Sequence, residues 1–215
     1  MRCRRGAREA IPITVVKVGG SLLARTDLPR ELKCFLSSLG KAKILLICGG
    51  GPTADLVRDW DRRFGLGEEN AHWLALGAMG LNGGLLAKLI PSSRLCPSLP
   101  QIQEAWRAGG IPILDPVPFI RAEERRSRVR LPHSWEATSD SVAAWVAGRL
   151  GAEEVLLLKS TPPPRHEDIE ELVEASYVDT CFPGITQAAN LRCFFTALAK
   201  GVRRPRTGRR RGGLR

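Results

Sequence analysis

The sequence predicts a single α/β domain built on a largely parallel β-sheet. Its 215 residues suit one domain, and a hydrophobic content of 43% is enough for a sizeable core. Apolar runs rich in β-branched residues alternate along the chain with helical patterns, which is typical of parallel sheets. No apolar run reaches the roughly 18 residues that a membrane-spanning helix needs.

The first half of the chain is predicted as two strand–helix units followed by a long helix. Both strands end at glycines, and Pro52 suits the first turn of a helix. The long helix has a weak point at Gly83 and Gly84. We expect strands over 13–18 and 43–48, and helices over 28–39, 52–64 and 68–90.

The second half continues the alternation with one interruption. The periodic pattern is lost between Pro116 and Pro132, and the alternating charges of RAEERRSRVR (121–130) predict a surface excursion there. Three consecutive prolines at 162–164 predict a loop. We expect helices over 101–108, 138–150 and 167–175, and strands over 111–114, 154–158 and 191–198.

The net charge of +11 resembles that of a nucleic-acid-binding protein, but its distribution argues against this class. Residues 1–10 have a net charge of +3 and residues 200–215 one of +8, whereas residues 11–199 hold 21 basic and 21 acidic side chains. We therefore expect a basic extension (1–10), a neutral folded domain (11–199) and a disordered Arg-rich tail (200–215). Such a tail binds nucleic acid only in a salt-sensitive, sequence-independent way.

Six cysteines are scattered through the chain without a CxxC motif or the Cys/His spacing of a zinc site. We interpret them as reduced thiols of a cytoplasmic protein, and we expect no metal site formed by side chains. The basic start of the chain is not followed by the apolar stretch of a signal peptide, which agrees with this location.

Two glycine-rich segments each follow a strand and precede a helix. Lys17 comes two residues before Gly19 and Gly20, and three further glycines occupy 49–51. One such turn is most simply a tight connection beside an ordinary lysine. Two in successive units favour an anion site, because glycines let backbone N–H groups approach phosphate oxygens at the strand ends. Neither segment fits the GxxxxGK[ST] or GxGxxG patterns.

A third segment combines a polar helix start with a lysine at the end of a strand. Thr138, Ser139 and Asp140 open a predicted helix, where such residues usually act only as caps. Lys159 ends an apolar strand, and a lysine in this position either extends to solvent or is held by a charge partner.

These segments, in this order, resemble the amino acid kinase family. The matching stretches are VVKVGGSLL, ILLICGGG, TSDS and LLLKST, and they span residues 14 to 161. The resemblance implies a three-layer αβα sandwich with a mainly parallel central sheet. It also implies a homo-oligomer that uses ATP and Mg²⁺ to phosphorylate a small phosphate or carboxylate, with the metal held largely by the nucleotide.

The resemblance also implies roles for individual residues. Lys17 and Lys159 would stabilise the transferred phosphoryl group, and Asp140 would lie between them and orient them. The residues that would hold the nucleotide are Gly19, Gly20, Ser21, Ser160 and Thr161. Those on the acceptor side would be Gly49, Gly50 and Gly51. Such positioning and charge neutralisation are what phosphoryl transfer between anions needs.

Three other segments, HWLAL, LPHSW and the later VD with FP, resemble one branch of this family, the archaeal-type kinases of methanofuran biosynthesis. These phosphorylate an aminomethylfuran methyl phosphate. His133 and Trp135 would contact such an aromatic acceptor, and the candidates for pairing with its ammonium group are Asp55, Asp59 and Asp115. The simpler interpretation is that His72 and Trp73 pack in the core and that LPHSW closes a loop over it.

One segment departs from the family pattern. Where the family continues KxTDVDGVY, this chain has three prolines after Lys159, Ser160 and Thr161. The alternative function is therefore a non-catalytic nucleotide- or oxyanion-binding homologue that serves as a storage or regulatory subunit.

Overall fold

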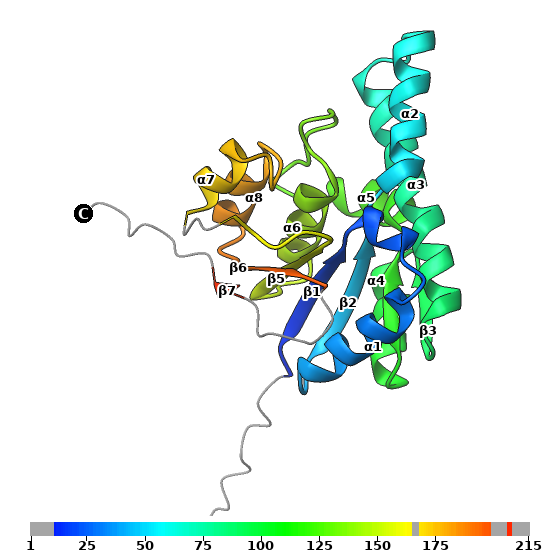
Figure 1. The fold of residues 1–215 in the computed structure, drawn as a ribbon, viewed down its shortest axis with the longest axis vertical. Coiled ribbons are helices and arrows are strands. Elements are labelled where there is room, and N and C mark those ends of the chain that lie inside the picture. The colour runs from blue at the N-terminus through cyan, green and yellow to red at the C-terminus, as the bar shows by residue number, and fades with distance from the viewer. Residues whose placement is uncertain (1–10, 165–167, 199–205, 208–215) are drawn as a thin grey trace, which may run out of the picture.

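The computed structural model describes residues 11–164, 168–198 and 206–207. They form a seven-stranded sheet with the order β3-β4-β2-β1-β5-β6-β7, in which β1 to β6 are parallel and β7 is antiparallel to β6 (Figure 1). The strands are β1 (Ile13–Val18), β2 (Lys43–Cys48), β3 (Ser93–Cys96), β4 (Ile111–Leu114), β5 (Glu154–Lys159), β6 (Arg192–Ala197) and β7 (Arg206–Thr207).

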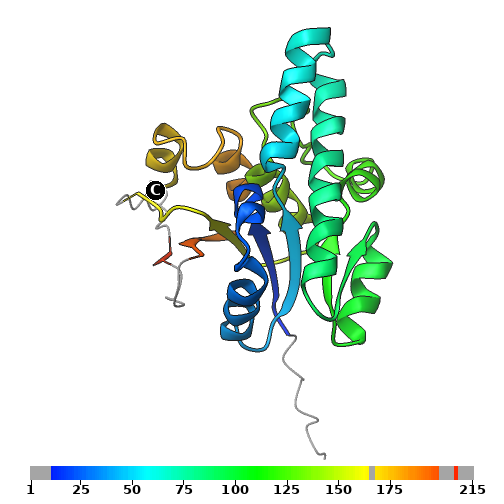
Figure 2. The ribbon, with the colours of Figure 1, turned by 45° about the vertical axis from the view of Figure 1, so that its right-hand side comes forward.

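Helices cover both faces of the sheet, so the predicted three-layer α/β architecture is confirmed. One face packs against α1 (Leu28–Ser38) and the carboxyl-terminal part of α3 (Glu68–Leu89). The other face packs against five helices: α4 (Leu99–Arg107), α5 (Pro116–Glu124), α6 (Ser139–Arg149), α7 (Ile169–Glu174) and α8 (Phe182–Ala188). The helix α2 (Gly51–Phe64) runs beside α3, and the pair projects beyond the strand ends (Figure 2).

Alternation along the strands decides which side chains share a face. Val16 and Leu156 contribute to the core under α1, whereas Val15 and Leu157 contribute to the core under α6. Lys17 and Lys159 have the same parity as this second set, and Lys17 pairs in register with Leu157. Both lysines therefore lie on the α6 side of two adjacent strands.

Among the elements that the sequence did not predict are the helices α5 and α8 and the strand β3. The helix α5 begins where no periodic pattern was recognised and extends into the predicted surface excursion, which is therefore wrong for residues 121–124. Its prolines, like Pro183 of α8, lie in the first helical turn, where proline removes no hydrogen bond that the helix needs. The third element, β3, is a four-residue strand at the sheet edge with only Cys96 fully buried, so its apolar pattern is weak.

The predicted weak point of α3 is not a break. A Cβ atom at Gly83 would lie 3.1 Å from a methyl group of Leu95 and 3.3 Å from one of Ile113. Glycine at this position therefore allows the helix to pack closely on β3 and β4, and α3 continues without interruption to Leu89.

The terminal extensions lie almost entirely outside the described residues, so the predicted boundaries 1–10, 11–199 and 200–215 stay predictions. The two described residues of this region, Arg206 and Thr207, form β7. No helix in the described part of the chain is long and apolar enough to cross a membrane. The five described cysteines are free, and burial raises the pKa of Cys48 to about 12.

Candidate active site

The carboxyl ends of β1 and β5 meet the first turn of α6, and there the structure places two lysines around one aspartate. Lys17 Nζ lies 2.9 Å from Asp140 Oδ1, and Lys159 Nζ lies 2.7 Å from Asp140 Oδ2. The side chains of Lys17, Asp140 and Lys159 are 8%, 5% and 17% exposed. Two ammonium groups thus share one carboxylate in a largely dry site, which leaves an excess positive charge directed at any bound anion.

Burial and the ion pairs act in opposite directions on these groups. Burial disfavours the charged form of Asp140, but the two lysines outweigh it and lower the pKa of its carboxyl group. For Lys159, burial outweighs the attraction of Asp140, and its pKa is lowered. Lys159 also donates a hydrogen bond to the carbonyl of Tyr177 and lies 4.6 Å from the centre of that ring.

Asp179 holds the start of α6 in place. Its Oδ2 accepts hydrogen bonds from Thr138 N at 3.0 Å, Thr138 Oγ1 at 2.7 Å and Ser141 N at 3.0 Å, and its Oδ1 accepts one from Ser141 Oγ. Thr138 is the N-cap, as its sequence position predicts. The carboxylate that completes the cap comes from the loop before α8, so sequence spacing alone could not identify it.

The two glycine-rich loops pack directly against each other. A Cβ atom at Gly20 would lie 2.2 Å from the backbone nitrogen of Gly51, and Gly51 has a φ of +49°. Gly49 N donates to Val18 O at 2.8 Å, and Gly19 N donates to Leu158 O at 2.8 Å. These glycines are therefore required for the contact between the loops, a reason that the sequence did not reveal.

The residues predicted to hold a nucleotide form one rim beside this contact. Ser21 Oγ donates to Ser160 Oγ at 3.2 Å and joins the loop after β1 to the loop after β5. Thr161 O accepts a hydrogen bond from Tyr177 Oη at 3.1 Å. Ser21, Ser160 and Thr161 are exposed, so their polar groups are accessible to a ligand that approaches Lys159.

On the other side of the lysines, beyond the second glycine loop, lies a cavity of about 220 Å³. Gly50 and Gly51 line it, together with Asp55, Trp135, Ser139 and His72 among others. Asn82 of α3 supports this wall by donating to Gly49 O at 2.8 Å and to Gly50 O at 2.7 Å. Asn82 was not singled out from the sequence, although a polar residue inside an apolar helix is the signal that could have identified it.

The loop between α5 and α6 is fastened to α3 by His133. Its Nδ1 lies 2.7 Å from Glu69 Oε2 and its Nε2 lies 2.9 Å from Glu124 Oε1. Burial opposes protonation, but the two carboxylates outweigh it and raise the pKa of His133. The structure therefore places His133 behind the cavity wall rather than among its lining residues, where it stacks on His72 at 4.5 Å.

Trp135 and His72 face the cavity from opposite elements. Trp135 Nε1 donates to Asp61 Oδ2 at 2.8 Å, and the guanidinium of Arg58 lies 4.6 Å from the centre of the Trp135 ring system. His72 is 4% exposed, and burial together with His133 lowers its pKa to about 4. The cavity thus has an aromatic wall on one side and a neutral imidazole on the other.

Of the three aspartates proposed for an ammonium group, only Asp55 lines the cavity. Asp59 pairs with Arg62 and Arg63 on the outside of α2. Asp115 lies beside Gly80, and burial raises the pKa of its carboxyl group. No group of three or more His, Cys, Asp or Glu side chains among the described residues is arranged to hold a metal ion.

Residues 12–163 match the model of the Amino acid kinase family. The chain belongs to this family. A curated family relative, the [5-(aminomethyl)furan-3-yl]methyl phosphate kinase of Methanocaldococcus jannaschii, is 30% identical over 144 residues. That match covers 66% of this chain and 63% of the relative, so it spans less than two thirds of the relative's length.

Solved structures of other amino acid kinases have the same fold. Uridylate kinase from Archaeoglobus fulgidus superposes with a TM-score of 0.63 at 18% identity, covering 86% of this chain and 90% of that one. UMP kinase from Ureaplasma parvum gives 0.61 at 14% identity, covering 87% and 90%. Carbamate kinase from Giardia lamblia bound to AMP-PNP gives 0.53 at 12% identity, covering 88% and 93%. These likenesses confirm the predicted amino acid kinase fold.

Proposed function

We propose that the chain is an ATP-dependent kinase that transfers the γ-phosphoryl group to a small phosphate or carboxylate. The observation that supports this most strongly is the buried triad Lys17, Asp140 and Lys159 beside the contact of the two glycine loops. An acceptor oxygen forms the new bond to the γ-phosphorus while the bond to the β–γ bridging oxygen breaks and ADP leaves. Lys17 and Lys159 neutralise charge on the transferred group, and Asp140 fixes their positions.

The nucleotide is assigned to the rim formed by Gly19, Gly20, Ser21, Ser160 and Thr161. The hydroxyl groups of Ser21 and Ser160 meet there, next to the ammonium group of Lys159. Mg²⁺ held by the nucleotide phosphates supplies further charge neutralisation when bound. We assign the enzyme to the cytoplasm, because the free thiols of the described cysteines agree with a reducing compartment.

The acceptor is assigned to the cavity beside Gly50 and Gly51, and the proposed acceptor is an aminomethylfuran methyl phosphate. The start of α2 has no side-chain cap, so its first N–H groups favour the acceptor's phosphate. Trp135 offers a flat surface to a furan ring, and the carboxylate of Asp55 can pair with an ammonium group. The name of the relative from M. jannaschii supports the same acceptor.

Two assignments, the kinase activity and the furan phosphate acceptor, are tested by measuring ADP release in the presence of ATP, Mg²⁺ and a set of acceptors. The set includes [5-(aminomethyl)furan-3-yl]methyl phosphate, UMP, aspartate and carbamate. We expect turnover with the furan phosphate, loss of turnover in Lys17→Met, and unchanged turnover in Lys33→Met, which alters an exposed lysine on α1. Turnover with a different acceptor contradicts the furan assignment, and no turnover with any acceptor contradicts the kinase assignment.

The alternative function is a non-catalytic relative that binds a nucleotide or oxyanion. The observation that favours it is the proline loop at 162–164, which replaces the family's Asp-Gly turn next to Thr161. Calorimetric titration with ATP distinguishes the two: binding without turnover supports the alternative. Absence of binding at millimolar ATP contradicts the kinase and an ATP-regulated subunit alike.

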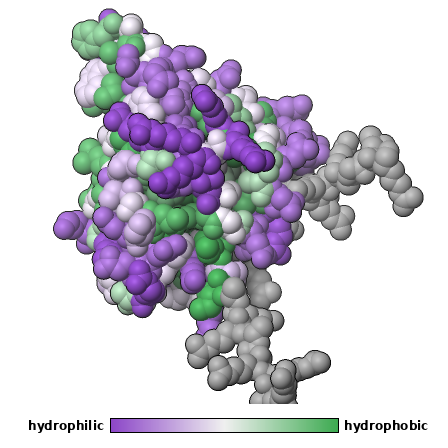
Figure 3. Space-filling view, turned by 180° about the vertical axis from the view of Figure 1, so that it is seen from behind, coloured by the Kyte–Doolittle hydropathy of each residue, from purple (hydrophilic) through white to green (hydrophobic). Residues whose placement is uncertain are grey.

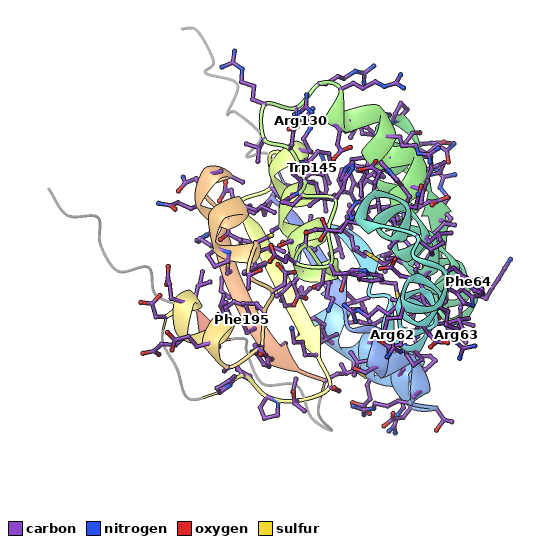
Figure 4. The ribbon with its side chains drawn as sticks, turned by 90° about the horizontal axis from the view of Figure 1, so that it is seen from above. Arg62, Arg63, Phe64, Arg130, Trp145 and Phe195 are labelled. Carbon is purple, nitrogen blue, oxygen red and sulfur yellow. The ribbon has the colours of Figure 1, made fainter. Side chains whose placement is uncertain are left out.

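We also propose that the protein is a homo-oligomer that associates through α2 and α3. Large apolar side chains are exposed along these helices, and Figure 3 shows apolar surface at the projecting end of the pair. In Figure 4, Phe64 points away from the molecule at this end. The exposed set is Leu56, Trp60, Phe64, Leu74, Leu81 and Leu85. Light scattering of Leu81→Glu tests this: we expect a smaller species than the wild type, and an unchanged mass contradicts the assigned surface.

A further inference from the structure

A second cavity of about 370 Å³ lies between the loop after α5 and the ends of α6 and α8. It shares no lining residue with the acceptor cavity. Its floor is apolar and is formed by Val129, Trp145, Ile185, Ala188 and Ala189. Three arginines also line it: Arg126, Arg128 and Arg149. Neither the glycine loops nor the lysine–aspartate triad has a part in this cavity, and the function proposed above leaves it unused.

The arginines of this cavity exceed the acidic groups that face them. Glu123 pairs with Arg149 at 2.8 Å and with Arg126 at 3.2 Å. Within the described part of the chain, Arg128 has no ion-pair partner, and the buried Nε of Arg149 has no hydrogen-bond acceptor. Three guanidinium groups against one carboxylate leave a positive charge at a cavity, although residues 11–199 are neutral as a whole.

The arginines are not needed to complete the two helices that end here. At the end of α6, Val146 O accepts from Leu150 N at 3.0 Å and Gly148 O accepts from Gly151 N at 3.2 Å. At the end of α8, Ile185 O accepts from Ala189 N at 3.1 Å. Because backbone donors already satisfy these carbonyls, helix capping does not account for the arginines.

We propose that this cavity is a second ligand site, which binds a small phosphorylated metabolite with a ring or short aliphatic part. Guanidinium groups donate paired hydrogen bonds to phosphate oxygens, so Arg126, Arg128 and Arg149 would take the phosphate. The apolar floor around Ile185 and Trp145 would take the remainder of the ligand.

The same loop lines both cavities, which gives the second site a route to the first. Residues 126–129 line the second cavity, called the arginine cavity below, and residues 134, 135 and 137 line the acceptor cavity. Trp145 Nε1 donates to Val129 O at 2.8 Å and ties the loop to α6, whose first turn contains Asp140. We infer that a ligand bound in the arginine cavity changes the KM for the acceptor, an inference that rests on the proposed kinase function.

Tryptophan side chains provide a separate reporter for each cavity. Of the five tryptophans in the chain, Trp145 lines the arginine cavity and Trp135 the acceptor cavity. Their indole ¹H–¹⁵N signals, assigned with Trp→Phe variants, are followed in the full chain during titration with phenyl phosphate. We expect a saturable shift of the Trp145 signal, a weaker response to inorganic phosphate, and none to benzyl alcohol, which lacks the anion.

Arginine variants distinguish specific binding in the cavity from nonspecific attraction of the anion to positive charge on the surface. Arg126→Ala and Arg128→Ala remove exposed side chains, and we expect each to weaken phenyl phosphate binding by about tenfold. Arg130→Ala is the matched control, because this exposed arginine, labelled in Figure 4, is on the same loop but is not a lining residue of the cavity. No saturable Trp145 shift at millimolar phenyl phosphate overturns the proposal, as does equal weakening by Arg130→Ala.

The inferred effect of the arginine-cavity ligand on the acceptor KM is tested by a separate measurement. The acceptor KM is measured with and without phenyl phosphate in the wild type and in Arg128→Ala. We expect a change in the wild type that is lost in the variant, and an equal change in both proteins overturns the coupling. If the chain proves to have no kinase activity, the Trp145 titration is unaffected, so failure of the proposed function and failure of this site are distinguishable.

Discussion

Replacing Asp140 by asparagine isolates the electrostatic core of the candidate site. The substitution keeps the size of the side chain and removes the negative charge that Lys17 and Lys159 share at 2.9 Å and 2.7 Å. Because the three side chains are at most 17% exposed, water cannot replace the lost partner. Two ammonium groups are then left close together without a counter-charge.

The expected cost follows from that burial. Breaking a buried ion pair by removing one partner destabilises a protein by roughly 3–5 kcal/mol. For a domain of this size each kcal/mol lowers Tm by about 2–4 °C, so Asp140→Asn should lower Tm by roughly 6–20 °C. The pKa of Lys159, already lowered by burial, should fall further, because Asp140 contributes more than any other group to raising it.

The cost is measured by thermal and urea unfolding of four proteins. They are the wild type, Asp140→Asn, Lys159→Met and the double variant Asp140→Asn/Lys159→Met. Once Asp140 is neutral, removing the charge of Lys159 relieves a repulsion, so the second substitution should cost far less than it does alone. We expect a coupling energy of about 1–3 kcal/mol. Single effects that add within about 0.5 kcal/mol would refute the shared carboxylate.

Two further predictions test the glycine loops and the histidine that fastens the loop before α6. Gly20→Ala should prevent stable folding, because its Cβ would lie 2.2 Å from the backbone nitrogen of Gly51. Gly84→Ala on α3 is the control: its Cβ meets no atom within 4 Å, so this variant should raise the free energy of unfolding in urea by about 0.5–1 kcal/mol. Similar stabilities of the two variants would contradict the loop contact. The raised pKa of His133 means that its pairing with Glu69 and Glu124 contributes stability below the unfolded pKa of about 6.5 and loses it as pH rises through the folded value. The wild type should therefore exceed His133→Phe in unfolding free energy by more at pH 6 than at pH 9, and a difference that grows with pH would contradict this.

The glycine segments and the lysines near the strand ends predict a candidate site at one edge of the sheet, but not the contacts that support it. Lys17 and Lys159 could be placed because each ends a recognisable apolar strand, and parallel strands bring such ends to one edge of a sheet. The supporting roles of Asp179 and Asn82 could not be predicted, because only the folded chain brings their partners near. His72 was expected to pack in the core, and its stacking on His133 depends on the fold in the same way.

The net charge of the whole chain is a poor guide to the kind of ligand that the protein binds. The overall excess of +11 is produced by the two ends of the chain and suggested a polyanionic partner. Residues 11–199 carry no net charge, and within them basic side chains gather locally at Lys17 and Lys159 and at the cavity lined by Arg126, Arg128 and Arg149. Both are suited to small anions.

In the proposed reaction, Lys17 and Lys159 act on a phosphoryl group that passes from ATP to an acceptor phosphate. ³¹P NMR of the wild-type protein with ATP, Mg²⁺ and [5-(aminomethyl)furan-3-yl]methyl phosphate follows that group directly. We predict that the acceptor's single phosphorus signal is replaced by the two coupled signals of a diphosphate as ADP appears, and that Lys17→Met and Lys159→Met each abolish the change. An unchanged acceptor signal in the wild type, or diphosphate formation that persists in both lysine variants, would contradict the account.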